Sequence, residues 1–574
     1  MNRRTKKSGA DLPIWRRRIV IGLFVLAVGA LESRLVWLQL MQGDYLSAEA
    51  EERQFRRVEI AAHRGMLTDR HGDPLAVSTP LDSIVVNPQA IGSNRDAIYA
   101  LAAAVGLDGA AVERRITSNN ERQFLYIERQ MPPAEAARVM ELGIKGVWKV
   151  REYGRFNPAH EVTSHLVGYT DIDDIGQEGL EAIYDHLLRG QPGEKIVQQD
   201  LEGREIGDVA LIEAARPGRY IRTSIDMKLQ YPAYVALKTA IQQHGASWGS
   251  VVLLDAVTGE VLAMANQPTF NPNDTAQRTG EEVRNRAITD IVEPGSTIKP
   301  LILAAALANG YSPDDIVDVP QVFEIDGERI TYEDRPLGLA SLTEILAASS
   351  NPGMAKIGSS LEPRVLWQTL TNLGIGRATD SGLSGRESLG SLDDYRSWRA
   401  QRHATISYGY GLSVTPLQLA RAYAAIASGG MLPPISLLAL DEPPERTQAI
   451  DPEVADQIMR MMEVVVSDQG TGSRAAIANF RVAGKTGTAR VAQSGGYSDD
   501  QYHAIFAGVA PASNPRFVCV VVISDPRGQA YHGGDVAAPV FSKVVGTALR
   551  LHAVEPDALV EPEIELLSHA GVGR

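Results

Sequence analysis

The stretch EPGSTIKPLILAAALANG, at residues 293–310, determines where one helix of this chain begins and ends. Pro300 has no backbone N–H and is tolerated only in the first turn of a helix, so the helix begins close to Ser296. The apolar residues that follow predict a buried helix, and Gly310 is a typical residue at a helix end. A serine hydroxyl is therefore expected at the start of this helix, where free N–H groups stabilise negative charge.

Lys299 follows Ser296 by three positions, so both side chains lie on the same face of the helix. A serine hydroxyl is a poor nucleophile until a base removes its proton, and a lysine amine does so only when it is neutral. Burial or a neighbouring cation lowers the lysine pKa in that direction. Alone, a Ser-x-x-Lys pair is expected by chance about once in such a chain, and a serine that caps a helix is its ordinary explanation.

Two further motifs make that ordinary explanation insufficient. Ser349 and Asn351 lie in ASSNPG after a helical segment, and Lys-Thr-Gly-Thr occupies 485–488 in a strand pattern. The order Ser-x-x-Lys, Ser-x-Asn, Lys-Thr-Gly belongs to serine enzymes that penicillin acylates. A phosphate-binding loop around GKT is excluded, because Asn479 stands where its first glycine would be. The three motifs are expected to meet in one cleft.

A second folded unit is expected from about Gly218 onward. WGSVVLLDAVTGEVLAMA predicts a hairpin, FRVAGKTGTARVA with YHAIFAGVAP a second strand pair, and RFVCVVVISD a fully buried strand. KPLILAAALANG and TPLQLARAYAAIASGG between them predict helices with glycine C-caps. The pattern indicates one sheet whose first strands come early in the sequence of this unit and whose last strands come late, with helices between them. Residues 41–215 mix short strands and helices without a catalytic group of residues.

The N-terminus predicts a membrane segment. Seven basic residues and one acid precede residue 19, and Ile19 begins an apolar run of 13 residues. With flanking residues, Trp15 to Arg34 supplies 20 positions, or about 30 Å at roughly 1.5 Å each. We favour an uncleaved anchor over a signal peptide cut after Ala30, because apolar residues continue in RLVWLQL. The basic excess orients the preceding tail to the cytoplasm.

Composition excludes several classes of site. The net charge of −14 argues against a nucleic-acid surface. The single cysteine, Cys519, allows no intrachain disulfide and is expected to be a buried, inert thiol. His160 and His165 in HEVTSH diverge by about 140° on a helix, so they cannot share a zinc ion. Neither a metal nor a cofactor is expected.

The motifs and their surroundings resemble a class B penicillin-binding protein, a peptidoglycan D,D-transpeptidase, over roughly residues 15–545. RNRAITDIVEPGSTIKP and SYGYGLSVTPLQLARAYAAIASGG are similar to the family's surroundings of the nucleophile and the groove. HRGMLTDRHGDPLAVS and HLVGYTDIDDIGQEGLE resemble its N-terminal pedestal module. Ser-Ser-Asn and Lys-Thr-Gly-Thr-Ala-Arg resemble the cell-division, or septal, branch of the family.

The resemblance implies an α+β chain with the penicillin-binding transpeptidase fold, in which an antiparallel sheet is flanked by helices and carries a helical subdomain. An N-terminal α+β pedestal and one transmembrane helix complete it. The implied domains are a cytoplasmic tail at 1–14, an anchor at 15–40, a dimerisation-like pedestal at 41–217, the transpeptidase domain at 218–550 and a C-terminal tail at 551–574.

Catalytic roles follow from the resemblance for five residues. Ser296 attacks the substrate carbonyl and Lys299 takes its proton. Ser349 relays a proton, Asn351 holds the amide of the donor peptide, and Lys485 supplies electrostatic support near the first lysine.

Substrate binding is implied for Thr486, Gly487 and Thr488, with both threonines on the substrate carboxylate. The oxyanion is assigned to the backbone N–H groups of Ser296 and Thr488. The sequence departs from the family pattern at Pro352, which is expected to keep the preceding asparagine extended, and at His532, where the family usually carries an aromatic residue. Both departures concern the shape of the groove.

The implied partners are stem peptides ending in D-Ala-D-Ala, β-lactams, the inner membrane, a glycosyltransferase and other division proteins, with the catalytic domain in the periplasm. Two other functions stay open. A β-lactamase or β-lactam sensor has the same motifs, although a sensor would need more than the about 14 residues that precede the anchor. A non-catalytic division scaffold would use only the anchor, pedestal and groove.

Overall fold

The computed structural model describes residues 14–40, 55–199, 205–331, 337–379, 381–382, 387–493 and 496–558. Its contacts divide the chain into two compact units. The first comprises the described parts of Met1–Ala62, Pro80–Glu152 and Gln191–Arg216, and the second those of His63–Thr79, Tyr153–Gly190 and Pro217–Arg574. The domain boundaries expected from the sequence stay predictions.

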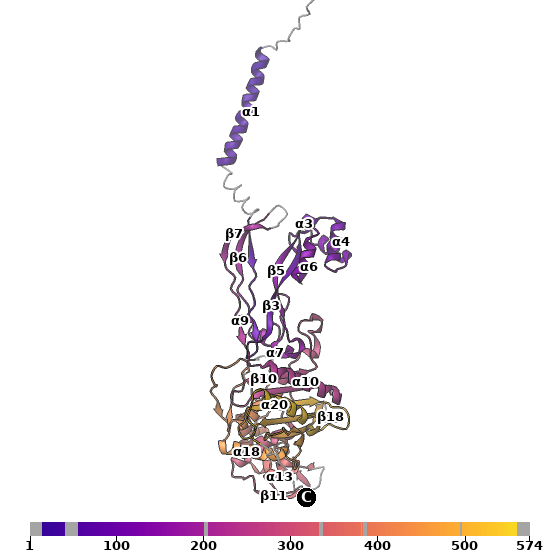
Figure 1. Cartoon of the computed structure of the whole chain (residues 1–574), viewed down its shortest axis with the longest axis vertical. Coiled ribbons are helices and arrows are strands. Elements are labelled where there is room, and N and C mark those ends of the chain that lie inside the picture. Colours follow the sequence, from indigo (N-terminus) through magenta and orange to yellow (C-terminus); the bar gives the residue numbers. More distant parts are fainter. Residues whose placement is uncertain are drawn as a thin grey trace, which may run out of the picture. The chain divides into compact units, whose positions relative to one another are not determined.

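The N-terminal segment forms one helix, α1 (Ile14–Leu40), of 27 residues (Figure 1). Ile14–Gln39 is long and apolar enough to cross a membrane, and it is the one such helix among the described residues. At roughly 1.5 Å per residue α1 is about 40 Å long, which exceeds the hydrocarbon core of about 30 Å. Its apolar side chains, such as those of Leu26 and Leu31, are exposed. The helix extends beyond the 20 positions counted from Trp15 to Arg34.

The first unit contains a three-stranded antiparallel sheet with β6 in the centre, and its strands lie side by side in Figure 1. A second layer pairs β3 with β4 and packs helices around Ile84, Leu101 and Ile116. The alternation of strands and short helices predicted for this region is confirmed. The elements that lie wholly in this unit are β1 (Phe55–Ile60), β6 (Gly193–Gln199), β7 (Glu205–Glu213), β4 (Leu125–Met131), α3 (Pro88–Ile91), α4 (Arg95–Ala104), α5 (Gly109–Thr117) and α6 (Pro133–Met140). Two strands, β3 (Pro74–Val86) and β5 (Val147–Phe156), belong to it only over 80–86 and 147–152.

An antiparallel sheet of five strands, ordered β10-β9-β19-β18-β17, forms the centre of the second unit. Its strands confirm both predicted strand pairs and the predicted buried strand. Val518 and Val520 of β19 belong to the core on one face, and Cys519 and Val521 belong to the core on the other. Burial on both faces explains the continuous apolar run of this strand. The strands are β9 (Trp248–Asp255), β10 (Val261–Gln267), β17 (Ala483–Gln493), β18 (Gly496–Ala510) and β19 (Phe517–Ser524).

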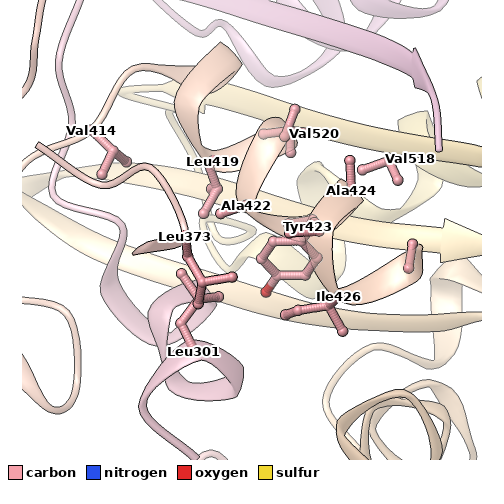
Figure 2. Close-up of a cluster of buried hydrophobic side chains, with 14 of the residues drawn as sticks. Leu301, Leu373, Val414, Leu419, Ala422, Tyr423, Ala424, Ile426, Val518 and Val520 are labelled. Atoms are coloured by element: carbon pink, nitrogen blue, oxygen red, sulfur yellow. The ribbon is translucent and has the colours of Figure 1, made fainter. Parts of the chain in front are cut away.

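Helices cover both faces of this sheet. On one face lie α10 (Met227–His244) and α20 (Ala538–Leu551), which pack against each other and on the strands. On the other lies α17 (Pro416–Ala427), which Figure 2 shows beside Val518 and Val520. The helix α12 (Lys299–Leu307) belongs to the same core, and all of its residues are buried.

Glycines follow both helices within two positions of the C-cap residues, which are Ala308 and Ser428. The N–H of Gly430 donates to the carbonyl of Ala425 at the end of α17, and that of Gly310 donates to Leu307 at the end of α12. Smaller elements complete the second unit. They are β2 (Leu67–Thr68), β8 (Ile221–Arg222), α7 (Ser164–Val167), α8 (Gly179–Ile183), α9 (Asp185–Leu188), α11 (Arg286–Thr289), β11 (Ile316–Val319), β12 (Val322–Ile325), β13 (Glu328–Thr331), β14 (Gly338–Ser341), α13 (Leu342–Ala347), α14 (Asn351–Ser360), α15 (Pro363–Asn372), α16 (Ala400–Ile406), β15 (Met431–Leu432), β16 (Thr447–Gln448), α18 (Pro452–Val466) and α19 (Gly533–Val536).

A buried group of charges joins two of the sequence segments that resemble the pedestal module. Arg64 and Glu181 are 1% and 0% exposed, and the guanidinium donates to the carboxylate at 2.8 Å. Arg155 donates to the second oxygen of the same carboxylate at 2.6 Å. Burial raises the pKa of the neighbouring Asp174 to about 6, although Arg64 opposes that shift. The carboxylate of Glu181 is thus the common acceptor of two buried cations.

Candidate active site

Ser296 lies in a short 3-10 turn, η4 (Gly295–Ile298), that leads directly into α12. Gly295 has φ +50°, a backbone conformation that side chains disfavour, and its N–H donates to the carbonyl of Gly409 at 3.2 Å. Pro300 occupies the first turn of α12, as the sequence predicted. The serine is therefore held half-buried at the start of a buried helix, one turn ahead of Lys299.

The turn that carries Ser296 lies against β17, the strand of the Lys-Thr-Gly-Thr motif. A Cβ atom at Gly487 would come within 2.9 Å of Thr297 Cγ2 and 3.0 Å of the Pro294 carbonyl oxygen. Glycine is required here because any side chain would push the strand away from the turn. The third motif thus directly borders the segment that carries the first.

Lys299 connects the first motif to the second. Its Nζ donates to the carbonyl oxygen of Ser349 at 2.6 Å and to Oδ1 of Asn351 at 2.8 Å. The Ser349 hydroxyl lies 3.3 Å from the same nitrogen. Ser349 itself has φ +57°, an unusual conformation for a residue with a side chain. The amine is therefore surrounded by oxygen atoms of the second motif.

Lys485 reaches the same hydroxyl from β17. Its Nζ donates to Ser349 Oγ at 3.0 Å and to the carbonyl oxygen of Thr486 at 3.2 Å. One hydroxyl thus lies between two amines that come from segments far apart in the sequence. The expected meeting of the three motifs is present in the structure.

Burial sets the charge of both amines. Lys299 and Lys485 are 0% exposed, and neither forms an ion pair with a carboxylate of the described residues. Burial lowers the pKa of Lys299 well below its usual value, and the nearby Lys485 lowers it further. Burial lowers the pKa of Lys485 to about 7. Both effects favour the neutral form of the Lys299 amine, which is the form that a proton acceptor next to Ser296 needs.

The second motif differs from its prediction in one respect. Pro352 was expected to keep Asn351 extended, but this asparagine is the first residue of α14 and the prediction is wrong. The hydroxyl of Ser350 caps the helix by accepting from the N–H of Gly353 at 3.2 Å. A proline in this first turn removes only an N–H that has no acceptor within the helix. The cap thus holds the amide side chain at the helix start.

The threonines of the third motif are held by hydrogen bonds. Thr486 Oγ1 lies 2.7 Å from Thr471 Oγ1, and Thr488 Oγ1 accepts from the N–H of Gly533 at 3.1 Å. A Cβ atom at Gly533 would come within 2.3 Å of the Gly487 carbonyl oxygen, so this glycine also permits a close backbone approach. Sequence reasoning identified neither Thr471 nor Gly533 as part of the site.

Tyr423 is another contributor that the sequence did not reveal. It is 0% exposed on α17, and its hydroxyl donates to the carbonyl oxygen of Thr297, next to Ser296, at 2.7 Å. Figure 2 shows its ring among the buried side chains of the helix. Apolar periodicity predicts that such a tyrosine is buried, but not which acceptor its hydroxyl meets.

Glu293 holds the opposite side of the turn. Its Oε1 accepts from the N–H of Gly411 at 2.8 Å and from the hydroxyl of Tyr497 at 3.1 Å. Burial raises the pKa of this carboxyl group above its usual value. The carboxyl group therefore fastens the residue three positions before Ser296 to two other segments of the second unit.

The arrangement has the parts that acyl transfer needs. A hydroxyl stands at a helix start, a buried amine with a lowered pKa lies one turn further, and a second hydroxyl connects that amine to another amine. Two threonines and an amide on the bordering segments carry groups that can form hydrogen bonds with a peptide.

Comparison with known protein families gives two matches. The penicillin-binding protein transpeptidase domain matches residues 249–546, and the penicillin-binding protein dimerisation domain matches residues 59–223. Together they include every residue discussed above for the site.

Curated relatives match nearly the whole chain. Peptidoglycan D,D-transpeptidase FtsI of Escherichia coli strain K12 is 40% identical over 559 residues, which cover 96% of this chain and 95% of that protein. The probable peptidoglycan D,D-transpeptidase PbpC of Pseudomonas aeruginosa strain PAO1 is 39% identical, with 97% and 99% covered.

Two solved structures of similar proteins also resemble this chain. A peptidoglycan synthetase from Bifidobacterium adolescentis has a TM-score of 0.70 at 26% identity, covering 88% of this chain and 98% of that one. The transpeptidase domain of penicillin-binding protein 3 from Burkholderia pseudomallei has a TM-score of 0.54 at 38% identity, covering 58% and 97%.

Proposed function

Because this chain belongs to the class B penicillin-binding proteins and is a peptidoglycan D,D-transpeptidase of the FtsI type, we propose that Ser296 is the nucleophile of its reaction. The hydroxyl attacks the carbonyl of the penultimate D-Ala of a stem peptide, and an ester to the enzyme forms as the terminal D-Ala leaves. The amine of a second stem peptide then attacks the ester. A new peptide bond cross-links the two strands and frees the serine.

Lys299 is the base that takes the serine proton. A neutral amine has two N–H donors, and the two shortest contacts of Lys299, to Ser349 O and Asn351 Oδ1, use both. The lone pair of the Lys299 amine is then free to accept the proton of Ser296, one helical turn before it. The lowered pKa of Lys299 supports this assignment.

Ser349 relays the proton to the leaving amine. Its hydroxyl accepts from Lys485 at 3.0 Å and lies 3.3 Å from Lys299, so it connects the base to the far side of the site. Lys485 orients this hydroxyl and keeps positive charge close to the developing negative charge. This bridging hydroxyl between two buried amines is the observation that carries the proposed function.

The remaining residues bind the substrate. Asn351 holds the amide of the donor peptide, and Thr486, Gly487 and Thr488 bind its carboxylate. The N–H groups of Ser296 and Thr488 stabilise the oxyanion, an arrangement in which one lost donor costs about 3 kcal/mol. The close approach of β17 to η4 supports this pairing.

Location and partners follow from the same proposal. The reaction serves septal cell-wall synthesis, and α1 crosses the inner membrane once, with a cytoplasmic N-terminus and a periplasmic catalytic domain. The pedestal extends over 41–217, the transpeptidase domain over 218–550 and a tail over 551–574. A separate glycosyltransferase supplies the strands, and other division proteins bind the same assembly.

Penicillin labelling of the detergent-solubilised full chain tests the nucleophile. We expect one covalent adduct by mass spectrometry on the unaltered chain, none on Ser296→Ala, and full labelling of Ser312→Ala, which changes an exposed serine outside the site. An unchanged adduct on Ser296→Ala would remove this mechanism. Rapid turnover of a chromogenic β-lactam would indicate a β-lactamase, and normal division with Ser296→Ala in the cell would indicate a scaffold.

A further inference from the structure

A hollow of about 370 Å³ lies in the second unit between α15 and the short turn η5 (Tyr395–Ser397). It shares no residue with the site described above. Its lining combines cations, aromatic rings and neutral hydrogen-bonding groups, contributed by Arg364, Trp367, Gln368, Thr371, Asn372, Arg377, Tyr395 and Arg396.

The helix α15 presents this lining on one face. Arg364, Trp367 and Thr371 follow one another at helical spacing, while Leu366 and Leu370 on the other face are buried in the core. The hydrophobic face therefore fixes the orientation of α15, and the polar face is left at the hollow.

The segment after α15 is also fastened to the core. The carbonyl oxygen of Arg377 accepts from Gln418 Nε2 at 2.6 Å, and Gln418 is 1% exposed in the first turn of α17. The backbone around the hollow is thus positioned before any ligand arrives, which lowers the entropic cost of binding.

Two of the three guanidinium groups at the hollow have no ion pair among the described residues. Arg396 pairs with Asp394 at 3.3 Å. Among the described residues, no carboxylate lies within ion-pair distance of Arg364 or Arg377. The protein as a whole carries a net charge of −14, so this group of positive charges is opposite in sign to the net charge of the chain. Arginine recognises carboxylates through paired hydrogen bonds, which makes an anion with carboxylate groups the fitting ligand.

The aromatic rings of the hollow indicate which kind of carboxylate-bearing ligand fits it. The rings of Trp367 and Tyr395 lie 5.7 Å apart at 53°, which makes an angled apolar wall. The indole N–H of Trp367 is buried and has no hydrogen-bond partner among the described residues. Such rings pack on the C–H faces of sugars, and the amide groups of Gln368 and Asn372 can bind hydroxyl oxygens.

We propose that this hollow binds a carboxylate-bearing segment of a peptidoglycan strand, with the sugar against Trp367 and the carboxylates at Arg364 and Arg377. The choice of strand rests on the proposed function, because the substrate of that reaction carries both sugar rings and carboxylates. The hollow holds the strand while the reacting stem peptide is in the catalytic site.

Binding of soluble, uncross-linked peptidoglycan strands to the penicillin-acylated full chain tests the proposal, because acylation occupies the catalytic site. We expect saturable binding that weakens with salt. Arg364→Gln combined with Arg377→Gln should weaken it about tenfold or more, since each exchange removes a charge-assisted hydrogen bond. Arg460→Gln combined with Arg550→Gln removes the same charge from exposed positions elsewhere and should leave binding unchanged.

Other probes separate the possible ligands. Strands stripped of their stem peptides should bind about tenfold more weakly than intact strands, because they lack the peptide carboxylates. Trp367→Leu should weaken the binding of intact strands, since it removes the ring against which the sugar packs. No binding to the acylated chain, or equal binding by the double arginine variant, would overturn the proposal. Tighter binding of poly-glutamate than of strands would overturn it in favour of an acidic protein partner.

Penicillin labelling separates this proposal from the proposed function. Labelling of the double arginine variant at the normal rate shows that the variant is folded and that its catalytic site is intact. Loss of labelling in the unaltered chain would contradict the transpeptidase mechanism and, with it, the choice of strand as the ligand, whereas normal labelling without strand binding would contradict the proposal for the hollow alone.

Discussion

The hydroxyl of Tyr423 donates a hydrogen bond of 2.7 Å to the carbonyl oxygen of Thr297, across 126 positions of sequence. This contact ties the residue beside Ser296 to the helix that packs on the central sheet. The buried hydroxyl donates to the backbone of the turn, so its role is to position the turn.

Tyr423→Phe should slow acylation by penicillin about fivefold, because the turn loses one buried hydrogen bond of about 1 kcal/mol. Stopped-flow measurement of acylation separates this effect on the rate constant from any change in the initial binding of penicillin, which we expect to stay the same. Tyr311→Phe, which removes a hydroxyl contact with the exposed Ser360, is the matched control. An unchanged acylation rate in Tyr423→Phe would refute the positioning role.

The acylation rate should depend on the protonation of Lys485. Because burial lowers the pKa of Lys485 to about 7, this side chain loses its positive charge as the pH rises through that value. We therefore expect acylation to slow above about pH 7. Lys485→Arg keeps the charge at all these pH values and should abolish the decline, even if its rate is lower throughout. A pH–rate profile of the variant with the same decline would assign it to another group.

Gly487→Ala should lower acylation by about a hundredfold or more, because the added Cβ atom meets the Pro294 carbonyl and Thr297 and shifts β17 away from Ser296. Gly207→Ala is the control, since nothing lies within 4 Å of a Cβ atom there. Circular dichroism should show that both variants are folded. Normal acylation of a folded Gly487→Ala chain would show that the close approach is not needed.

Glu181→Gln should lower the free energy of unfolding of the second unit by about 3 to 5 kcal/mol, because Arg64 and Arg155 lose a buried counter-charge. Thermal unfolding followed by circular dichroism measures the loss. The exposed Glu445→Gln should change little. A similar melting temperature for both variants would mean that water reaches these arginines and replaces the carboxylate.

Local signals predicted much of the fold. Pro300 marked the start of α12, and the apolar run around Cys519 indicated a strand that is buried on both faces. These predictions succeeded because the decisive interactions are within a few residues, or depend only on burial. Asn351 shows the limit, because its helical conformation depends on the capping hydroxyl of Ser350, which outweighs the preference imposed by Pro352.

Fewer of the residues that make up the site could be predicted from the sequence. Lys299 and Ser349 are 50 positions apart, and only the resemblance to a family suggested that they meet. Thr471 and Gly533 belong to no recognisable motif and contribute a hydroxyl and a backbone N–H, respectively. Every chain has many such groups, so only the three-dimensional structure identifies the ones that matter.

β9 pairs with β19, and Trp248 lies opposite Ser524 in this pairing. The ribosome synthesises these two strands far apart in time. Until β19 is made, β9 and β10 have only each other to pair with, and a two-stranded hairpin is marginally stable at best. The segment that carries Ser296 is thus made before the last three strands of the sheet that it packs against. We expect chains that end before β19 to be inactive, because β9 then lacks the strand that joins it to β18 and β17.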